Sequence, residues 1–203
     1  ALGAPLFERD RRRVLLTTFG RDMVERAKRL LREASALRSA ALIAKDPLLG
    51  TLRIGVIPTI SPYFLPRATP ALREAYPSLM TVWVEDKTEY LMRALDDGAL
   101  EAALVALEAP LGEVDHAEIT RDPFVLATRA GDPLGCRSSP VSPGELRDRE
   151  VLLLDDGHCL RTQALDYCGA AKLRELEFRA TSLTTLTQMV AGGAGVTLLP
   201  ELA

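Results

Sequence analysis

Beyond about residue 48, short apolar runs alternate with amphipathic segments, and this alternation limits the possible folds more than any other feature of the chain. Strands and helices that alternate in this way form a parallel sheet with helices on its faces. The strands predicted in the first half of this region are Leu52 to Pro58, Met80 to Val84 and Leu100 to Leu107. We therefore expect an α/β fold that begins with a βαβαβ unit.

Two helices are predicted between these strands. The first extends from Tyr63 to Tyr76 and is expected to be broken at Pro66 and Pro70, because proline has no backbone N–H to donate. The second extends from Thr88, its predicted cap, through Leu95, and Gly98 closes it.

A second βα unit is predicted further along the chain. Its strands are Phe124 to Thr128, Val151 to Leu154, Leu176 to Arg179 and Gly195 to Leu199. Ser182 is expected to cap a helix before the last strand. Two units joined near Arg121 would give two lobes, residues 48–121 and 122–203, with a ligand cleft at the carboxyl ends of their strands.

The longest helical pattern precedes this alternation and occupies residues 20–46. Apolar or small residues recur in it at steps of four and three, and a rod of about 40 Å with such a heptad seam typically dimerises. Asp46-Pro47 is predicted to end the helix. The seam residues are Met23, Ala27, Leu30, Ala34, Leu37, Ala41 and Ala44.

Residues 1–19 are too few to fold alone, and Arg9 to Arg13 predicts a basic hairpin tip that leads into a strand. We expect the chain to be a piece of a longer protein whose N-terminal part precedes it. Residues 1–38 carry ten Lys or Arg and five Asp or Glu, a balance of +5 that leaves −8 for the rest of a chain with net charge −3. This asymmetry is typical of contact with a polyanion such as nucleic acid, or of a solvated basic helix.

The composition is that of a globular protein with a real core, since 47% of the 203 residues are hydrophobic. No apolar run reaches the roughly 18 residues of a membrane span, and the N-terminus lacks the order of a signal peptide. We therefore expect a cytoplasmic protein with no membrane contact. In that reducing compartment, Cys136, Cys159 and Cys168 are not expected to form structural disulfides.

One of these cysteines has an unusually polar setting. The run Val151 to Leu154 is followed by the turn Asp155-Asp156-Gly157 and by a predicted helix from Cys159 onward. A thiol in the first turn of a helix lies beside free backbone N–H groups and the positive end of the helix dipole. With His158 and Arg161 as further donors, we expect the Cys159 thiol to ionise more readily than a free one.

Cys168 follows Cys159 by nine residues, which in an ideal helix is a rotation of about 900° and a rise of about 13.5 Å. A disulfide requires Cα atoms within about 7 Å, so the two cysteines can bond only when the helix unfolds. Two other interpretations remain. Both cysteines can be buried core residues. Cys159, Cys168 and His158 can also be zinc ligands, although the usual Cys-x-x-Cys spacing is absent.

The motifs of this chain resemble those of the LysR-type transcriptional regulators. The stretches Leu6 to Arg9, Leu16 to Gly20 and Leu52 to Gly55, with the long helix between the last two, resemble that family at the exit from its winged helix-turn-helix. Three further stretches are similar to the peroxide-sensing OxyR branch, and the likeness covers essentially the whole chain. They are Gly55 to Thr59, Asp156 to Arg161, and Arg179 to Pro200.

This resemblance implies a periplasmic-binding-protein-like regulatory region of two βα lobes, the second incomplete, behind a dimerising linker helix. Residues 1–19 would be the end of the winged helix-turn-helix. The protein would be a regulator rather than an enzyme, with no cofactor or metal. It would form homodimers and homotetramers, bind promoter DNA and be reset by cellular thiol reductants.

The resemblance also implies how the site responds to hydrogen peroxide. Cys159 would be the peroxidatic thiol, oxidised to a sulfenic acid, and Cys168 the resolving thiol that forms an intramolecular disulfide with it. Thr59, His158 and Arg161 would help to bind the peroxide. Thr162 stands where the family often carries an acidic residue, so a proton relay through that position is not implied.

Two alternatives share part of this description. A thiol peroxidase-like enzyme would use the same thiol chemistry, but it has no need of a basic head and a heptad helix. A metabolite-sensing LysR-type regulator would instead bind a small molecule in the cleft. Counting free thiols after peroxide treatment distinguishes a peroxide sensor from a metabolite sensor. A turnover assay with a thioredoxin-type reductant distinguishes a regulator from a thiol peroxidase-like enzyme.

Overall fold

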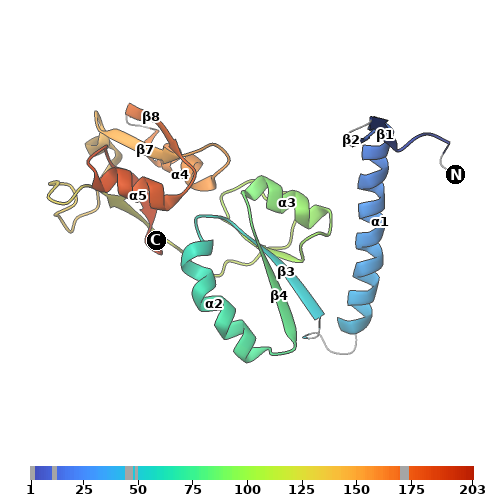
Figure 1. The fold of residues 1–203 in the computed structure, drawn as a ribbon. Coiled ribbons are helices and arrows are strands. Elements are labelled where there is room, and N and C mark those ends of the chain that lie inside the picture. Colours follow the sequence, from blue (N-terminus) through green and yellow to red (C-terminus); the bar gives the residue numbers. More distant parts are fainter. Residues whose placement is uncertain (1–2, 11–12, 44–47, 49, 170–173) are drawn as a thin grey trace.

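A computed structural model describes residues 3–10, 13–43, 48, 50–169 and 174–203. The described chain has three parts (Figure 1). A long helix with a small hairpin at one end lies beside a first α/β lobe, and a second α/β lobe lies on the far side of the first. The elements of lobe I lie within residues 50–104, and those of lobe II lie within residues 124–200. None of the described helices is long and apolar enough to cross a membrane.

The hairpin consists of β1 (Phe7–Asp10) and β2 (Arg13–Leu16), which pair antiparallel with Phe7 opposite Leu16. The predicted tip residues Arg11 and Arg12 lie outside the described residues. The chain then enters α1 (Thr18–Ile43), whose first turn is capped by Thr17, because its Oγ1 accepts a hydrogen bond from the Gly20 N–H at 2.8 Å. Gly20 is required there, since a Cβ would lie 2.1 Å from the Leu6 carbonyl oxygen.

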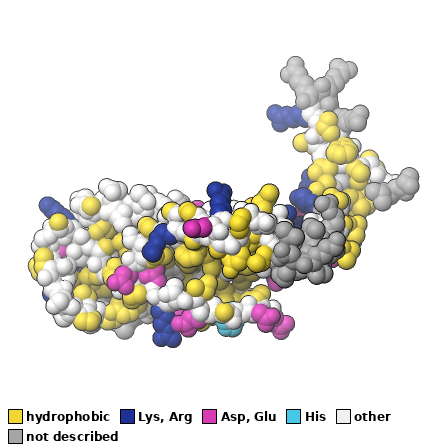
Figure 2. Space-filling view, turned by 90° about the horizontal axis from the view of Figure 1, so that it is seen from below, with side chains coloured by type: hydrophobic (Ala, Val, Ile, Leu, Met, Phe, Trp, Pro, Cys, Tyr) yellow, Lys and Arg dark blue, Asp and Glu magenta, His cyan; other side chains and the backbone are white. Residues whose placement is uncertain are grey.

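Helix α1 stands apart from the two lobes along most of its length (Figure 1). Its seam residues Leu30 and Leu37 are 72% and 73% exposed. Figure 2 shows hydrophobic side chains at the end of the molecule that holds α1 and the hairpin. The predicted helix is confirmed over Thr18–Ile43, where the backbone is continuously helical. The predicted end at Asp46-Pro47 and the seam residue Ala44 lie outside the described residues.

Lobe I has the predicted βαβαβ order, with β3 (Gly50–Val56), α2 (Ser61–Ala75), β4 (Leu79–Glu85), α3 (Thr88–Asp96) and β5 (Ala102–Leu104). The three strands are parallel, in the spatial order β4-β3-β5. Its core contains Ile57, Leu91, Ala94 and Leu100. Glycine at position 55 leaves space for the core side chains, because a Cβ there would lie 2.8 Å from Leu91 Cδ2 and from Leu100 Cδ1.

Two sequence-based expectations about these helices are wrong. Pro66 and Pro70 do not break α2, which is continuous from Ser61 to Ala75. Both prolines lie on the exposed side, where water can bond to the carbonyl groups that lose their N–H partners. Thr88 is not the cap of α3 but its first helical residue, and Lys87 occupies the cap position without a side-chain hydrogen bond.

Lobe II is a mixed rather than a purely parallel structure. Strands β7 (Glu150–Leu154) and β8 (Arg174–Ala180) are parallel, while β6 (Phe124–Ala127) pairs antiparallel with β9 (Thr197–Pro200). A short 3₁₀ helix, η1 (Pro143–Leu146), precedes β7. The helices are α4 (Cys159–Cys168) and α5 (Leu183–Ala191), and Ser182 caps α5 as predicted by accepting a hydrogen bond from the Thr185 N–H.

The exposed seam of α1 predicts association between copies of the chain. In a dimer formed through this seam, Leu30→Asp or Leu37→Asp would place an unpaired charge in the interface between the two helices. A cost of about 3 kcal/mol corresponds to an association that is about 100-fold weaker. Arg29→Asp is the matched control, because Arg29 lies outside the seam. Sedimentation velocity should show dissociation for the two leucine variants and not for the control. Unchanged assembly of both leucine variants would remove the coiled-coil interpretation.

Candidate functional site

The site begins with the turn between β7 and α4. Gly157 has φ +87°, a left-handed conformation that favours glycine and reverses the chain after Asp156. His158 then takes an extended conformation as the N-cap residue, and Cys159 is the first residue of α4. The predicted position of Cys159 in the first turn of a helix is therefore confirmed.

A small pocket forms where this turn meets lobe I. Lobe I contributes the carboxyl ends of β3 and β4, and lobe II contributes the start of α4. About 150 Å³ of space lies between the walls, which leave no room for a water-sized molecule in this conformation. The lining residues are Ile57, Pro58, Thr59, Lys87, Thr88, Gly157, His158 and Cys159.

The thiol of Cys159 is held against the core of lobe I, although α4 belongs to lobe II. This burial raises the pKa of the Cys159 thiol, because a buried thiolate loses its hydration. Hydrogen bonding by the Leu160 amide and the Thr88 hydroxyl opposes the effect without reversing it. The expectation that Cys159 ionises more readily than a free thiol is therefore wrong for this closed conformation.

His158 is also buried, with 6% of its surface exposed. Burial lowers the pKa of its imidazole, the positive charge of Lys87 lowers it further, and Asp155 acts in the opposite direction. His158 is therefore neutral at neutral pH. A neutral imidazole offers one hydrogen-bond donor and one acceptor to a polar molecule in the pocket.

Arg161 does not line the pocket. Its guanidinium pairs with two carboxylates, with Nε 3.0 Å from Asp156 Oδ1 and Nη1 2.7 Å from Glu175 Oε1. It also donates a hydrogen bond to the Leu154 carbonyl oxygen at 3.3 Å. The hypothesis that Arg161 helps to bind peroxide finds no support in this geometry, which instead gives Arg161 the task of fixing α4 to β7 and β8.

Cys168 lies in a different core from Cys159. It is 1% exposed and belongs to the lobe II cluster that includes Leu146, Val151 and Leu153. Burial raises the pKa of the Cys168 thiol as well. Cys136 is exposed, in the segment between β6 and η1. Within the described ranges, no three His, Cys, Asp or Glu side chains gather as a metal site would require.

The sequence-based prediction missed Thr88 and Lys87 as pocket residues. Apart from the Cys159 sulfur, the buried Thr88 Oγ1 has no hydrogen-bond partner in the described part of the chain. β4 ends at Glu85, and Lys87 and Thr88 follow it after one intervening residue, Asp86. Because ligands of α/β sheets bind at the carboxyl ends of the strands, the end of the predicted strand Met80 to Val84 is the sequence signal that points to these residues.

A sequence profile of the LysR substrate binding domain matches residues 45–203. The chain therefore belongs to the LysR substrate-binding-domain family.

Within that family the chain is similar to regulators of the OxyR type. It is 44% identical to the "Probable hydrogen peroxide-inducible genes activator" of Mycobacterium leprae over 205 residues, which is 100% of this chain and 65% of that protein. It is 39% identical to the "DNA-binding transcriptional dual regulator OxyR" of Escherichia coli K12 over 203 residues, which is 100% of this chain and 66% of that protein. The chain thus spans about 65% of the length of such relatives.

The likeness extends to solved structures. A cysteine-to-serine mutant of Corynebacterium glutamicum OxyR with bound H₂O₂ superposes with a TM-score of 0.71 at 37% identity, covering 98% of this chain and 64% of that one. At this identity and coverage the two chains share one fold.

The burial of Cys159 predicts that its alkylation rate reaches half of its maximum only at high pH. Because only the thiolate reacts with iodoacetamide, the alkylation rate of Cys159 should rise with pH with a midpoint above that of free glutathione. Cys136→Ser and Cys168→Ser together leave Cys159 as the single thiol for this measurement. A midpoint below that of glutathione would contradict the dominance of burial.

Proposed function

We propose that this chain is the linker helix and regulatory region of a transcription regulator that senses hydrogen peroxide through Cys159. The observation that supports it best is the placement of a cysteine beside hydroxyl and imidazole groups in a pocket at the carboxyl ends of β3 and β4. The identities to peroxide-inducible activators support the same assignment. In this proposal residues 1–19 end a winged helix-turn-helix, 20–46 form the dimerising linker, and 48–121 and 122–203 form the two lobes.

The first chemical step is attack of the Cys159 sulfur on one peroxide oxygen. The O–O bond breaks, the sulfur becomes a sulfenic acid, and the other oxygen leaves as hydroxide, which is protonated to water. Because burial keeps the thiol protonated, its proton must be removed during the attack, and the neutral His158 imidazole is the base in the pocket. Thr59 and Thr88 can donate hydrogen bonds to the departing oxygen.

The second step joins Cys168 to the oxidised Cys159. The Cys168 thiol attacks the sulfenic sulfur, a disulfide forms, and water leaves. In α4 the two Cα atoms are separated by about 13.5 Å, so most of the helix between them must unfold to bring them within about 7 Å. Cys168 must also leave the lobe II core.

Unfolding of α4 removes contacts to both lobes. Gln163 Nε2 donates a hydrogen bond to Glu108 Oε2 of lobe I at 2.7 Å, and Tyr167 Oη donates to the Val141 carbonyl oxygen of lobe II at 2.6 Å. The ion pair between Arg161 and Glu175 would be lost as well. Oxidation would therefore change the surfaces that the lobes present to neighbouring subunits. Through the linker helices, this change would alter how the protein binds promoter DNA.

We further propose that this regulator acts as a homodimer or homotetramer in the cytoplasm, where thiol reductants reset the disulfide. In this proposal it acts as a regulator rather than a turnover enzyme, because the relatives that it resembles are named as gene activators and regulators. A thiol peroxidase-like enzyme would instead consume peroxide catalytically with a thioredoxin-type reductant. Sustained turnover at a rate that matches dedicated peroxidases would favour that alternative.

Substitution of each cysteine by serine has a different predicted effect on the reaction with peroxide. Cys159→Ser should abolish the reaction with one equivalent of peroxide, Cys168→Ser should stop it at the sulfenic acid, and Cys136→Ser should leave it unchanged because Cys136 lies outside the pocket. Peptide mapping by mass spectrometry, with dimedone to trap the sulfenic acid, distinguishes these outcomes. A main disulfide that contains Cys136 would show that the assignment is wrong.

A further inference from the structure

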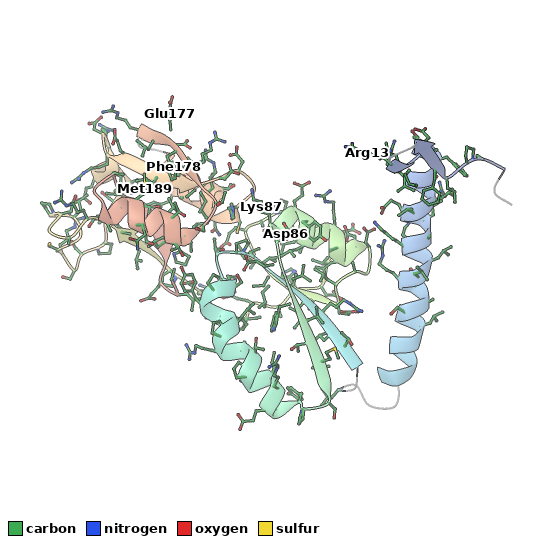
Figure 3. The ribbon with its side chains drawn as sticks, viewed as in Figure 1. Arg13, Asp86, Lys87, Glu177, Phe178 and Met189 are labelled. Atoms are coloured by element: carbon green, nitrogen blue, oxygen red, sulfur yellow. The ribbon has the colours of Figure 1, made fainter. Side chains whose placement is uncertain are left out.

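Lys87 connects the two lobes at the mouth of the pocket. It lies at the junction of β4 and α3 in lobe I, and its side chain reaches the turn before α4 in lobe II (Figure 3). Its Nζ donates a hydrogen bond to the Asp156 carbonyl oxygen at 2.5 Å and lies 3.5 Å from Asp155 Oδ2. The ammonium group therefore holds both the backbone and a side chain of that turn.

The aliphatic stem of Lys87 packs against the same turn. A Cβ on Gly157 would lie 3.0 Å from Lys87 Cδ, so the stem rests directly on the glycine backbone. Gly157 is two residues before Cys159, and the turn residues Asp155 to His158 determine where α4 begins. Any movement of the turn away from Lys87 would carry the Cys159 sulfur away from Thr59 and Thr88.

We propose that Lys87 is an inter-lobe positioning residue that keeps the Asp155–Cys159 turn closed on the pocket and so aligns Cys159 for its reaction with peroxide. This inference rests on the proposed function, and it adds a residue that acts on the reaction through the turn rather than by touching the peroxide. Lys87 and Asp155 are each 38% exposed, and ion pairs of that kind contribute little to the free energy of unfolding. The alignment of reacting atoms is far more sensitive, because a small displacement changes a reaction rate strongly.

The charge of Lys87 has a second effect that acts in the same direction. It helps to keep His158 neutral, against the opposite influence of Asp155. A neutral imidazole can accept the thiol proton, whereas an imidazolium cannot. Lys87 thus supports both the position of the thiol and the state of the base beside it.

Lys87→Met is the sharpest test, because methionine retains an apolar stem over Gly157 but removes the ammonium group. In the Cys136→Ser, Cys168→Ser background, we expect it to slow oxidation of Cys159 by peroxide about tenfold. Alkylation of Cys159 by iodoacetamide, which needs only an accessible thiolate, should not slow. Lys87→Arg should restore the peroxide rate to within about threefold, since arginine retains the charge and the donors.

Hydrogen exchange of the reduced protein supplies a measurement that does not depend on peroxide. Amides of residues 155–160 should exchange faster in Lys87→Met than in the parent, and Asp155→Asn should produce a smaller change in the same direction. Arg93→Met is the matched control, because Arg93 forms an exposed ion pair with Glu89 on α3 and should change neither measurement.

The proposal is overturned if Lys87→Met leaves the exchange of residues 155–160 unchanged. It is also overturned if the turn loosens while the peroxide rate stays at the parent value, or if the peroxide and iodoacetamide rates fall by the same factor. A parent protein whose Cys159 does not react with peroxide would instead overturn the proposed function, and the exchange measurement would still decide whether Lys87 holds the turn.

Discussion

Helix α4 holds its two cysteines in separate hydrophobic cores, and the behaviour proposed for the site depends on that separation. Cys159, at the first position of the helix, packs against the core of lobe I, whereas Cys168, at the last position, is buried in the core of lobe II. The helix is therefore both a spacer between two thiols and a connection between two lobes. A bond between the thiols and an intact helix exclude each other.

The free energy lost when α4 unfolds and the free energy gained from the disulfide are similar in size, which makes the disulfide reversible. Leu160 is 5% exposed, and exposing such a side chain costs about 1.5–3 kcal/mol. Ala164, also buried, adds a smaller cost, and the contacts of Arg161 are lost with them. Cross-linking a loop of this length gains about 3 kcal/mol in the unfolded chain, which is comparable to the packing that is lost. A disulfide formed at the expense of native packing is more easily reduced than a structural one.

The sequence predicts the local parts of this arrangement well. The strand before Asp155, the turn at Gly157 and a helix beginning at Cys159 follow from apolar runs and glycine, which act over a few residues. The heptad pattern likewise predicts α1, and the alternation of strands and helices predicts the parallel sheet of lobe I.

What the sequence could not supply depends on contacts between distant segments. The raised pKa of Cys159 arises because lobe I covers the thiol, which no local pattern records. The sequence places Arg161 near the thiol, but the ion pair with Glu175 on β8 holds its guanidinium away from the pocket. Lys87 reaches a turn nearly 70 residues away, so its role emerges only when both lobes are in place.

Hydrogen exchange of residues 160–167 before and after oxidation tests the central claim most directly. If the disulfide between Cys159 and Cys168 requires α4 to unfold, the amides of these residues are protected in the reduced protein and lose that protection in the oxidised one. Equal protection in both redox states, with the disulfide confirmed by peptide mapping, would contradict the account.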